Sequence, residues 1–101
     1  MLTHLPGKRV FITGAAGGIG RKLVIAFIEA GCYVDAADID ETGLDSLRKL
    51  YGQSELNTMI LDISNSEACQ LAINSTETTD ILINNAGASM GLIRDNHLNE
   101  L

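Results

Sequence analysis

The chain has 101 residues, 46% of them hydrophobic, and its 7 basic and 13 acidic residues give a formal charge of −6. This acidic balance argues against a nucleic-acid partner, because binding to the phosphate backbone needs clustered Lys and Arg. No apolar stretch approaches the roughly 18 residues that span a bilayer, and the N-terminal segment MLTHLPGKRV lacks the apolar core of a signal peptide. We therefore expect a cytoplasmic globular domain that binds neither nucleic acid nor membrane.

A glycine-rich segment at residues 13–20, TGAAGGIG, lies between an apolar run at 10–12 and a helical pattern over about 18–30. This order predicts a strand, a tight turn and a helix N-terminus. The unpaired N–H groups of a first helical turn and the positive end of the helix dipole form a ready site for phosphate. Glycine would let such a ligand approach the backbone. The alternative is a turn that only lets the helix pack closely on the strand.

Three helical patterns follow the turn. In the first, an apolar stripe at 3.6-residue spacing is formed by Ile19, Leu23, Phe27 and Ala30. Gly31 stands at the C-terminal cap position. The second covers about 41–51, with Leu44, Leu47 and Tyr51 on one face and Gly52 to stop it. The third begins at Ser64 with a capping-box pattern to Glu67 and turns Ala68, Leu71 and Ala72 inward.

Apolar runs at residues 33–37, 59–61 and 81–83 alternate with these helices. Strands that alternate with helices predict a parallel sheet with right-handed crossovers. We expect an α/β fold of about four strands in the order 3-2-1-4, flanked by helices. The first two helices would cover one face of the sheet and the third the other.

The second expected strand ends at Asp38, 18 residues beyond Gly20. An acidic residue about 20 positions past such glycines holds the adenosine ribose hydroxyls of NAD. A phosphate at the ribose 2′ position would meet this carboxylate as a like charge, and Ile39 and Asp40, which follow, supply no cation. The alternative is a solvated strand end that caps the next helix. We expect Asp40 to be that cap and Asp38 to be the ribose ligand.

The glycines read T-G-x-x-x-G-x-G rather than the common G-x-G-x-x-G. Two more fragments follow in order, LDIS with Asp62 after the third strand, and INNAG at 83–87 after the fourth. With Asp38 between them, the chain resembles the N-terminal, NAD(P)-binding half of the short-chain dehydrogenase/reductase family. The resemblance covers about residues 7–87 and implies a doubly wound Rossmann-type parallel sheet that binds NAD or NADP.

The resemblance also implies which residues bind the cofactor. Asp62 and Ile63 would contact the adenine, and the Asn-Asn-Ala-Gly segment would line the cofactor groove. The position before Gly18 is often basic in family members that use NADP; here it is Gly17, which, with Asp38, favours NAD over NADP. The expected cofactor-binding residues are Gly14, Ala16, Gly17, Gly18, Ile19, Gly20, Asp38, Asp62, Ile63, Asn85, Ala86 and Gly87.

The family's catalytic Tyr-x-x-x-Lys segment does not occur in this sequence. Ala37 stands four residues after Tyr33, and Glu55 stands four residues after Tyr51. A tyrosine with a pKa of about 10 is a poor base at neutral pH unless a neighbouring cation stabilises its phenolate. We therefore expect no catalytic residue in this chain and no activity from it alone. The two His and two Cys stand at no metal-ligand spacing, so no metal site is expected.

Three interpretations stay open. In the first, residues 1–101 are the N-terminal part of a single dinucleotide-binding domain, and the C-terminal catalytic half is absent from this sequence. The full-length oxidoreductase would then transfer a hydride between NAD and an alcohol or carbonyl substrate. In the second, the chain is a non-catalytic nucleotide-binding module, and in the third it is a degenerate remnant without function.

The fourth expected strand, residues 81–84, would leave an apolar edge bare. An open edge of this kind invites pairing with another chain. We therefore expect the isolated polypeptide to be marginally stable or to self-associate. A sharp melting transition of a monomer, independent of concentration, would contradict this expectation.

Overall fold

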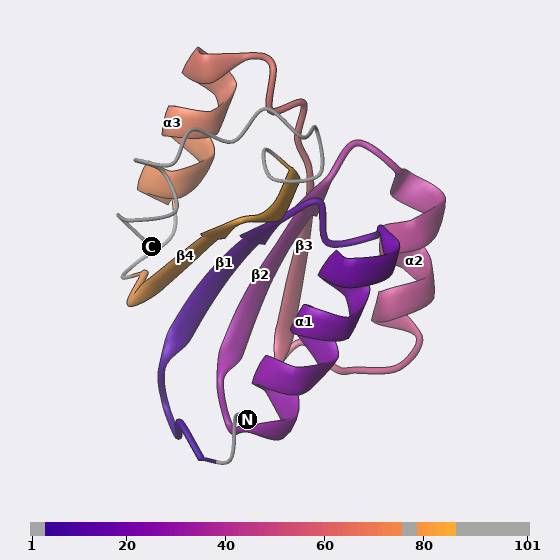
Figure 1. Ribbon diagram of the computed structural model, residues 1–101, viewed down its shortest axis with the longest axis vertical. Coiled ribbons are helices and arrows are strands. Elements are labelled where there is room, and N and C mark those ends of the chain that lie inside the picture. The colour runs from indigo at the N-terminus through magenta and orange to yellow at the C-terminus, as the bar shows by residue number, and fades with distance from the viewer. Residues whose placement is uncertain (1–3, 76–78, 87–101) are drawn as a thin grey trace.

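The computed structural model describes residues 4–75 and 79–86, in which strands alternate with helices (Figure 1). In chain order the elements are β1 (Arg9–Thr13), α1 (Gly18–Glu29), β2 (Tyr33–Asp38), α2 (Glu41–Arg48), β3 (Leu56–Ile60), α3 (Ser66–Ser75) and β4 (Ile81–Asn84). Gly87, which we expect to line a cofactor groove, lies outside the described residues.

The four strands form one parallel sheet in the order β3-β2-β1-β4, which confirms the expected order. Residues in register form rows across the sheet, and successive rows face opposite sides because side chains alternate along a strand. One row contains Leu82, Phe11, Asp35 and Asn57. The next row contains Ile83, Ile12, Ala36 and Thr58.

Helices cover both faces of the sheet, with α1 and α2 on one side and α3 on the other (Figure 1). This confirms the expected division. The larger core lies under α1 and α2, and its buried members include Val10, Ile12, Val24, Phe27, Val34, Leu44 and Leu47. A smaller cluster lies under α3 and is formed by Phe11, Ala37 and Leu61.

The ends of α1 and α2 form as their sequences predict. Gly31, just beyond α1, has a φ of +99°, the left-handed conformation in which helices commonly end on glycine. Asp40 precedes α2, and its carboxylate accepts a hydrogen bond from the Gly43 N–H at 3.2 Å. Asp40 is therefore the N-terminal cap that we expected.

Two expected boundaries are wrong. α2 ends at Arg48 rather than Tyr51, because the Leu50 N–H bonds to the Leu47 carbonyl and tightens the last turn. Tyr51 still packs against the larger core. The third strand is Leu56–Ile60 rather than residues 59–61. Leu56 is buried in the larger core, but Asn57 and Thr58 are polar and bond sideways to β2 and α2, which hides the strand from a search for apolar runs.

The start and the inner face of α3 also differ from expectation. α3 begins at Ser66, and the Asn65 side chain caps it by accepting a hydrogen bond from the Ala68 N–H at 2.9 Å. Ser64, the expected cap, instead donates its hydroxyl to Asp62. Leu71 is 67% exposed, because the stripe that packs on the sheet is made by Ala68, Cys69, Ala72 and Ile73. None of the described helices has the length and apolar content that crossing a membrane requires.

An ion pair between a fully buried carboxylate and a partly exposed arginine lies on the α3 side of the sheet. Asp35 has no exposed surface, and its carboxylate accepts hydrogen bonds from Arg9 Nε at 2.7 Å and Arg9 Nη2 at 3.0 Å. Asn57 Nδ2 donates a third bond at 3.0 Å, and the Arg9 guanidinium lies 4.6 Å from the centroid of the Tyr33 ring. Side chains thus link β1, β2 and β3 and satisfy a carboxylate that burial would otherwise penalise.

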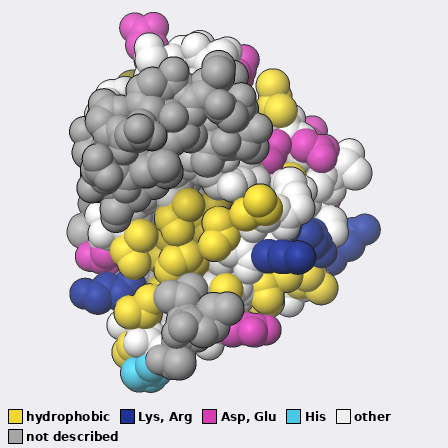
Figure 2. Space-filling view, viewed as in Figure 1, with side chains coloured by type: hydrophobic (Ala, Val, Ile, Leu, Met, Phe, Trp, Pro, Cys, Tyr) yellow, Lys and Arg dark blue, Asp and Glu magenta, His cyan; other side chains and the backbone are white. Residues whose placement is uncertain are grey.

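β4 forms one edge of the described sheet, with β1 as its hydrogen-bonded neighbour. Leu82 is 42% exposed, whereas Ile81 and Ile83 pack against the larger core. On the face seen in Figure 2, hydrophobic side chains gather at the centre with Lys and Arg on either side. Self-association through this edge stays a prediction.

Replacing Arg9 by Met should destabilise the fold strongly, because the Asp35 carboxylate would stay buried without its charged partner. Breaking a buried ion pair in this way costs about 3–5 kcal/mol. Arg48→Met is the matched control, because the Arg48–Asp45 pair is about half exposed and exposed pairs contribute about 0–1 kcal/mol. Urea denaturation followed by circular dichroism measures both losses. Equal losses would contradict the structural role of Arg9.

Candidate functional site

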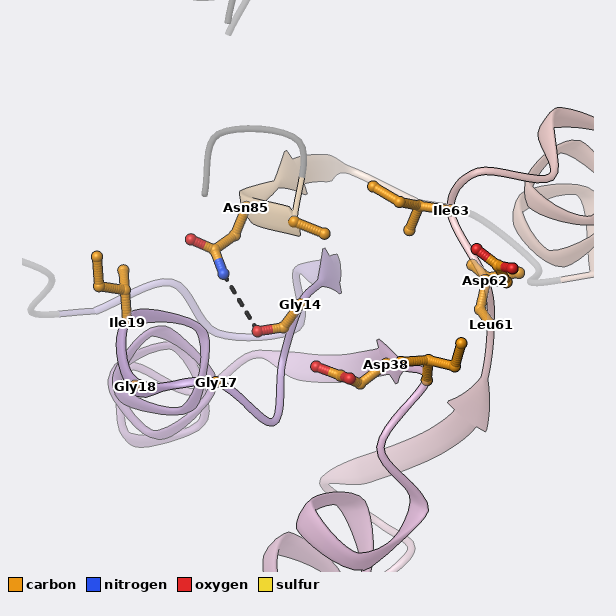
Figure 3. Close-up of a pocket in the computed structure, with 11 residues that line it drawn as sticks. Gly14, Gly17, Gly18, Ile19, Asp38, Leu61, Asp62, Ile63 and Asn85 are labelled. Carbon is orange, nitrogen blue, oxygen red and sulfur yellow. Dashed lines mark hydrogen bonds between the residues drawn. The ribbon is translucent and has the colours of Figure 1, made fainter. Parts of the chain in front are cut away.

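A cleft of about 510 Å³ opens at the carboxyl ends of the strands, beside the start of α1 (Figure 3). In open parallel α/β sheets, ligands bind outside the carboxyl ends of the strands where the strand order reverses. Here that point lies between β1 and β4. The cleft is lined by Gly14, Gly17, Gly18, Ile19, Asp38, Ile39, Leu61, Asp62, Ile63, Asn85 and Ala86.

The glycine turn is so tight that two of its positions exclude a side chain. Gly14 has a φ of +66°, and a Cβ there would lie 2.9 Å from the backbone nitrogen of Ala86. A Cβ at Gly20 would lie 1.9 Å from the carbonyl oxygen of Gly14. Gly20 therefore lets α1 pack directly against the turn, as in the close-packing alternative, and Gly14 lets the turn lie against the residues after β4.

Gly17 and Gly18 have a different role in the turn, because they line the cleft. A Cβ at Gly18 would meet nothing within 4 Å, and one at Gly17 would meet only the Gly14 oxygen at 3.6 Å. Gly17 stands at the N-cap position of α1 but has no side chain that could accept a hydrogen bond from the first turn. The first turn of α1 also carries no acidic residue. The N-terminus of α1 thus offers backbone N–H groups and a positive dipole end to the cleft.

Ile19 is expected both on the core stripe of α1 and at the cofactor site, and the first expectation is wrong. Its side chain is 69% exposed and lines the cleft (Figure 3). Leu23, Phe27 and Ala30, the other members of the stripe, are buried or pack against the core. The first turn of α1 lies over the cleft rather than over the sheet, so the stripe has no core to meet there.

Asp38 stands at the carboxyl end of β2, between the glycine turn and the start of α2. Its Oδ2 accepts a hydrogen bond from the Ala16 N–H at 2.9 Å, and its Oδ1 accepts one from the Asp40 N–H at 2.9 Å. A carboxylate oxygen can accept two hydrogen bonds, so each oxygen of Asp38 retains capacity for another donor. The carboxylate is therefore oriented by the backbone and still able to bind hydroxyl groups.

Asp62 follows β3 on the far side of the cleft from α1, next to Ile63 (Figure 3). The Ser64 hydroxyl and the Ser64 N–H donate to Asp62 Oδ1 at 2.7 and 2.9 Å. These bonds, first the one from the hydroxyl and then the one from the backbone, lower the pKa of Asp62 because they favour its charged form. Asp62 is thus a charged acceptor at neutral pH.

The residues after β4 are held against the end of β1. The Thr13 hydroxyl donates to Asn84 Oδ1 at 2.9 Å and accepts from the Ala86 N–H at 3.2 Å. Asn85 Nδ2 donates to the Gly14 carbonyl at 3.1 Å, the dashed line in Figure 3. These bonds hold Asn85 and Ala86 where they line the cleft.

Most of the expected cofactor-binding residues thus line one cleft, with two exceptions among the described residues. Gly20 packs under the turn, and Ala16 acts through its amide on Asp38. Sequence reasoning misses two lining residues, Ile39 and Leu61. Each is an apolar neighbour of an expected site carboxylate at the end of a strand, and that adjacency is the signal that could have found them.

The described lining of the cleft supplies backbone N–H groups and carboxylates. Its charged lining residues are Asp38 and Asp62, and no Lys, Arg, His, Cys or Tyr occurs in the described lining. No group of three side chains that could hold a metal ion occurs among residues 4–75 and 79–86. The arrangement offers an anion site at α1 and two carboxylates that accept hydrogen bonds from hydroxyl or amino groups.

The family model described as short chain dehydrogenase matches residues 8–100. An L-xylulose reductase from Mesocricetus auratus is 36% identical over 86 residues, which cover 85% of this chain and 34% of that protein. The crystal structure of a short chain dehydrogenase from Mycobacterium smegmatis is 28% identical with a TM-score of 0.73, covering 83% of this chain and 38% of the other. A serine dehydrogenase complexed with NADP+ is 29% identical with a TM-score of 0.66, covering 73% and 31%.

The chain spans about a third of the length of the curated relatives it matches. Its helix-flanked parallel sheet is shared with the solved structures that it resembles. Because the family model matches most of the chain and the fold agrees, this chain belongs to the short chain dehydrogenase family.

Proposed function

We propose that this chain is the NAD-binding N-terminal part of a cytoplasmic oxidoreductase that transfers a hydride between NAD and an alcohol or carbonyl substrate. Membership of the family supports the oxidoreductase class. The observation that carries NAD binding is the layout of the cleft, which has an uncapped helix N-terminus on one side and two carboxylates on the other.

The start of α1 suits a pyrophosphate group. Gly17 and Gly18 leave the space in front of the helix free of side chains, and the first-turn N–H groups complement negative charge. We propose that the backbone of Gly14, Gly17, Gly18 and Ile19 holds the two phosphates. Gly20 and Ala16 support that turn from behind.

The two carboxylates suit the adenosine end of the cofactor. We propose that Asp38 accepts hydrogen bonds from the ribose hydroxyls, because both of its oxygens retain acceptor capacity. Asp62 and Ile63 would contact the adenine, where a charged acceptor meets the exocyclic amino group. Asn85, Ala86 and Gly87 would line the groove toward the nicotinamide.

The same carboxylate underlies our proposal that NAD is preferred over NADP. A 2′-phosphate beside Asp38 would bring two like charges together at hydrogen-bond distance, which is unfavourable in a partly buried site. The described lining holds no Lys or Arg to compensate. A related serine dehydrogenase is complexed with NADP+, so the preference is a property of individual members.

When bound, NAD supplies or accepts the hydride. The residues of this chain bind and orient the cofactor, and the Tyr-x-x-x-Lys pair that moves the proton in this family is not in its sequence. We therefore propose that this chain alone catalyses no turnover. The absence of the Tyr-x-x-x-Lys pair also favours the alternative function, a nucleotide-binding module without catalysis.

The intact mass of the polypeptide captured from its source cells separates these two functions. A mass near 10.8 kDa favours the binding module. A mass more than twice as large favours the oxidoreductase, whose additional sequence must then contain the Tyr-x-x-x-Lys pair.

Replacing Asp38 by Asn should weaken NAD binding by about tenfold or more, because hydrogen bonds to a charged group contribute about 1.5–3 kcal/mol. The preference for NAD over NADP should fall at the same time, because the like charge opposite the 2′-phosphate is gone. Isothermal titration calorimetry with both dinucleotides measures the effect, and Asp45→Asn, on the exposed surface of α2, is the control. An unchanged NAD affinity would remove Asp38 from the ribose site.

Alanine at two glycines should separate binding from folding. Gly18→Ala should leave the melting temperature unchanged or slightly higher, because its Cβ meets nothing in the protein and alanine favours helix, yet it should weaken dinucleotide binding. Gly20→Ala should unfold the turn, because its Cβ would lie 1.9 Å from the Gly14 oxygen. Thermal melts and calorimetry on both variants test this. Full NAD affinity in Gly18→Ala would place the phosphates elsewhere.

A further inference from the structure

Gly43 stands inside α2, at a position where helix propensity alone favours alanine. A Cβ at Gly43 would lie only 2.5 Å from the Cβ of Ala16 and 2.9 Å from Asp40 Oδ2. Approaches under 3.0 Å force one of the partners to move, and a methyl group on a tight turn has no rotamer to adopt. The missing side chain of Gly43 therefore lets the first turn of α2 lie directly against the glycine turn.

Both segments that meet at Gly43 hold the carboxylate of Asp38. The Ala16 N–H donates to Asp38 Oδ2 and the Asp40 N–H donates to Asp38 Oδ1, each at 2.9 Å. The Gly43 N–H itself donates to Asp40 Oδ1 at 3.2 Å. The distance between the glycine turn and α2 thus determines whether both oxygens of Asp38 keep their backbone donors.

We propose that Gly43 is a positioning residue for cofactor selectivity. By letting Ala16 approach α2, it fixes the Asp38 carboxylate in the orientation that accepts ribose hydroxyls and opposes a 2′-phosphate. Gly43 does not line the cleft, so it acts through Ala16 and Asp38. This inference rests on the proposed binding of NAD at the cleft.

The expected effect is on selectivity as well as affinity, for a geometric reason. With Ala16 displaced, Asp38 keeps a backbone donor on one oxygen only, and the carboxylate is free to rotate. Hydrogen bonds weaken steeply with misalignment, and the repulsion of a 2′-phosphate falls with distance. NAD therefore loses contacts, whereas NADP loses contacts and a repulsion together.

A double-mutant cycle in the full protein that carries this chain tests the contact. Gly43→Ala introduces the clash with Ala16, and Ala16→Gly removes the methyl group that it meets, so the double variant should recover. Gly52→Ala is the matched control, because its Cβ would meet nothing within 4 Å and its φ is not in the left-handed region. The close contact between a Cβ at position 43 and Asp40 Oδ2 remains in the double variant. Any loss that Ala16→Gly does not rescue is therefore assigned to the Asp40 cap.

We expect Gly43→Ala to weaken NAD binding by about tenfold and to lower the ratio of NAD to NADP affinity by a similar factor, as measured by calorimetry. The Ala16 amide should exchange its hydrogen faster in the same variant without any ligand, because its bond to Asp38 is weakened. Both changes should largely revert in the double variant. Gly52→Ala should change neither.

Two results would overturn the inference while leaving the proposed function intact. In the first, the wild-type protein binds NAD, and Gly43→Ala lowers the stability but leaves the ratio of NAD to NADP affinity unchanged. Gly43 would then have a structural role only. The other is a selectivity loss that Ala16→Gly fails to rescue, which removes the contact with Ala16. A wild-type protein that binds neither dinucleotide would instead overturn the proposed function and this inference with it.

Discussion

The carbonyl oxygen of Gly14 is the acceptor on which the cleft depends. It accepts a hydrogen bond from the Gly17 N–H at 3.3 Å and another from Asn85 Nδ2 at 3.1 Å. It also occupies the space that a Cβ at Gly20 would enter, at 1.9 Å. One atom thus joins the turn, the first turn of α1 and the residues after β4, which places the N-terminus of α1 at the point where the strand order reverses.

The glycines of the turn therefore fall into two groups with different surroundings. Gly14 and Gly20 are required by the protein's own packing, since a Cβ at either would meet backbone. A Cβ at Gly18 would meet nothing and one at Gly17 would make only an ordinary contact, so packing among the described residues does not explain why they carry no side chain. A ligand that comes close to the backbone does explain it. The packing interpretation of this segment is therefore confirmed for Gly14 and Gly20, and the proposed binding of a dinucleotide would account for Gly17 and Gly18.

The fold followed from the sequence wherever local signals and tertiary contacts agree. The alternation of strands and helices predicts the sheet order, and Gly31 and Asp40 form the caps that their types favour. Predictions fail where a partner distant in sequence determines which residue type a position carries. The polar Asn57 interrupts the apolar pattern of β3 because it bonds to Asp35, and that partner lies in another strand.

The same limit applies to the cleft. Asp38, Asp62 and Asn85 are predictable because motif spacing places them at strand ends. Ile39 and Leu61 line the cleft as well, but Ile39 is an exposed apolar residue and Leu61 belongs to the smaller core. Core leucines and single exposed apolar residues are both common, so neither side chain indicates binding without its neighbouring carboxylate at the strand end.

Two aspartates of β2 illustrate how one residue type serves structure and binding on the same strand. Asp35 is buried and its charge is neutralised by Arg9, so it joins strands and has no charge left to offer. Asp38, at the strand end, is held by two backbone N–H groups, which are neutral donors. No Lys or Arg in the described part of the chain forms an ion pair with Asp38. Its orientation is thus set by backbone donors, while no ion pair within residues 4–75 and 79–86 compensates its charge. The proposed preference for NAD over NADP requires this combination.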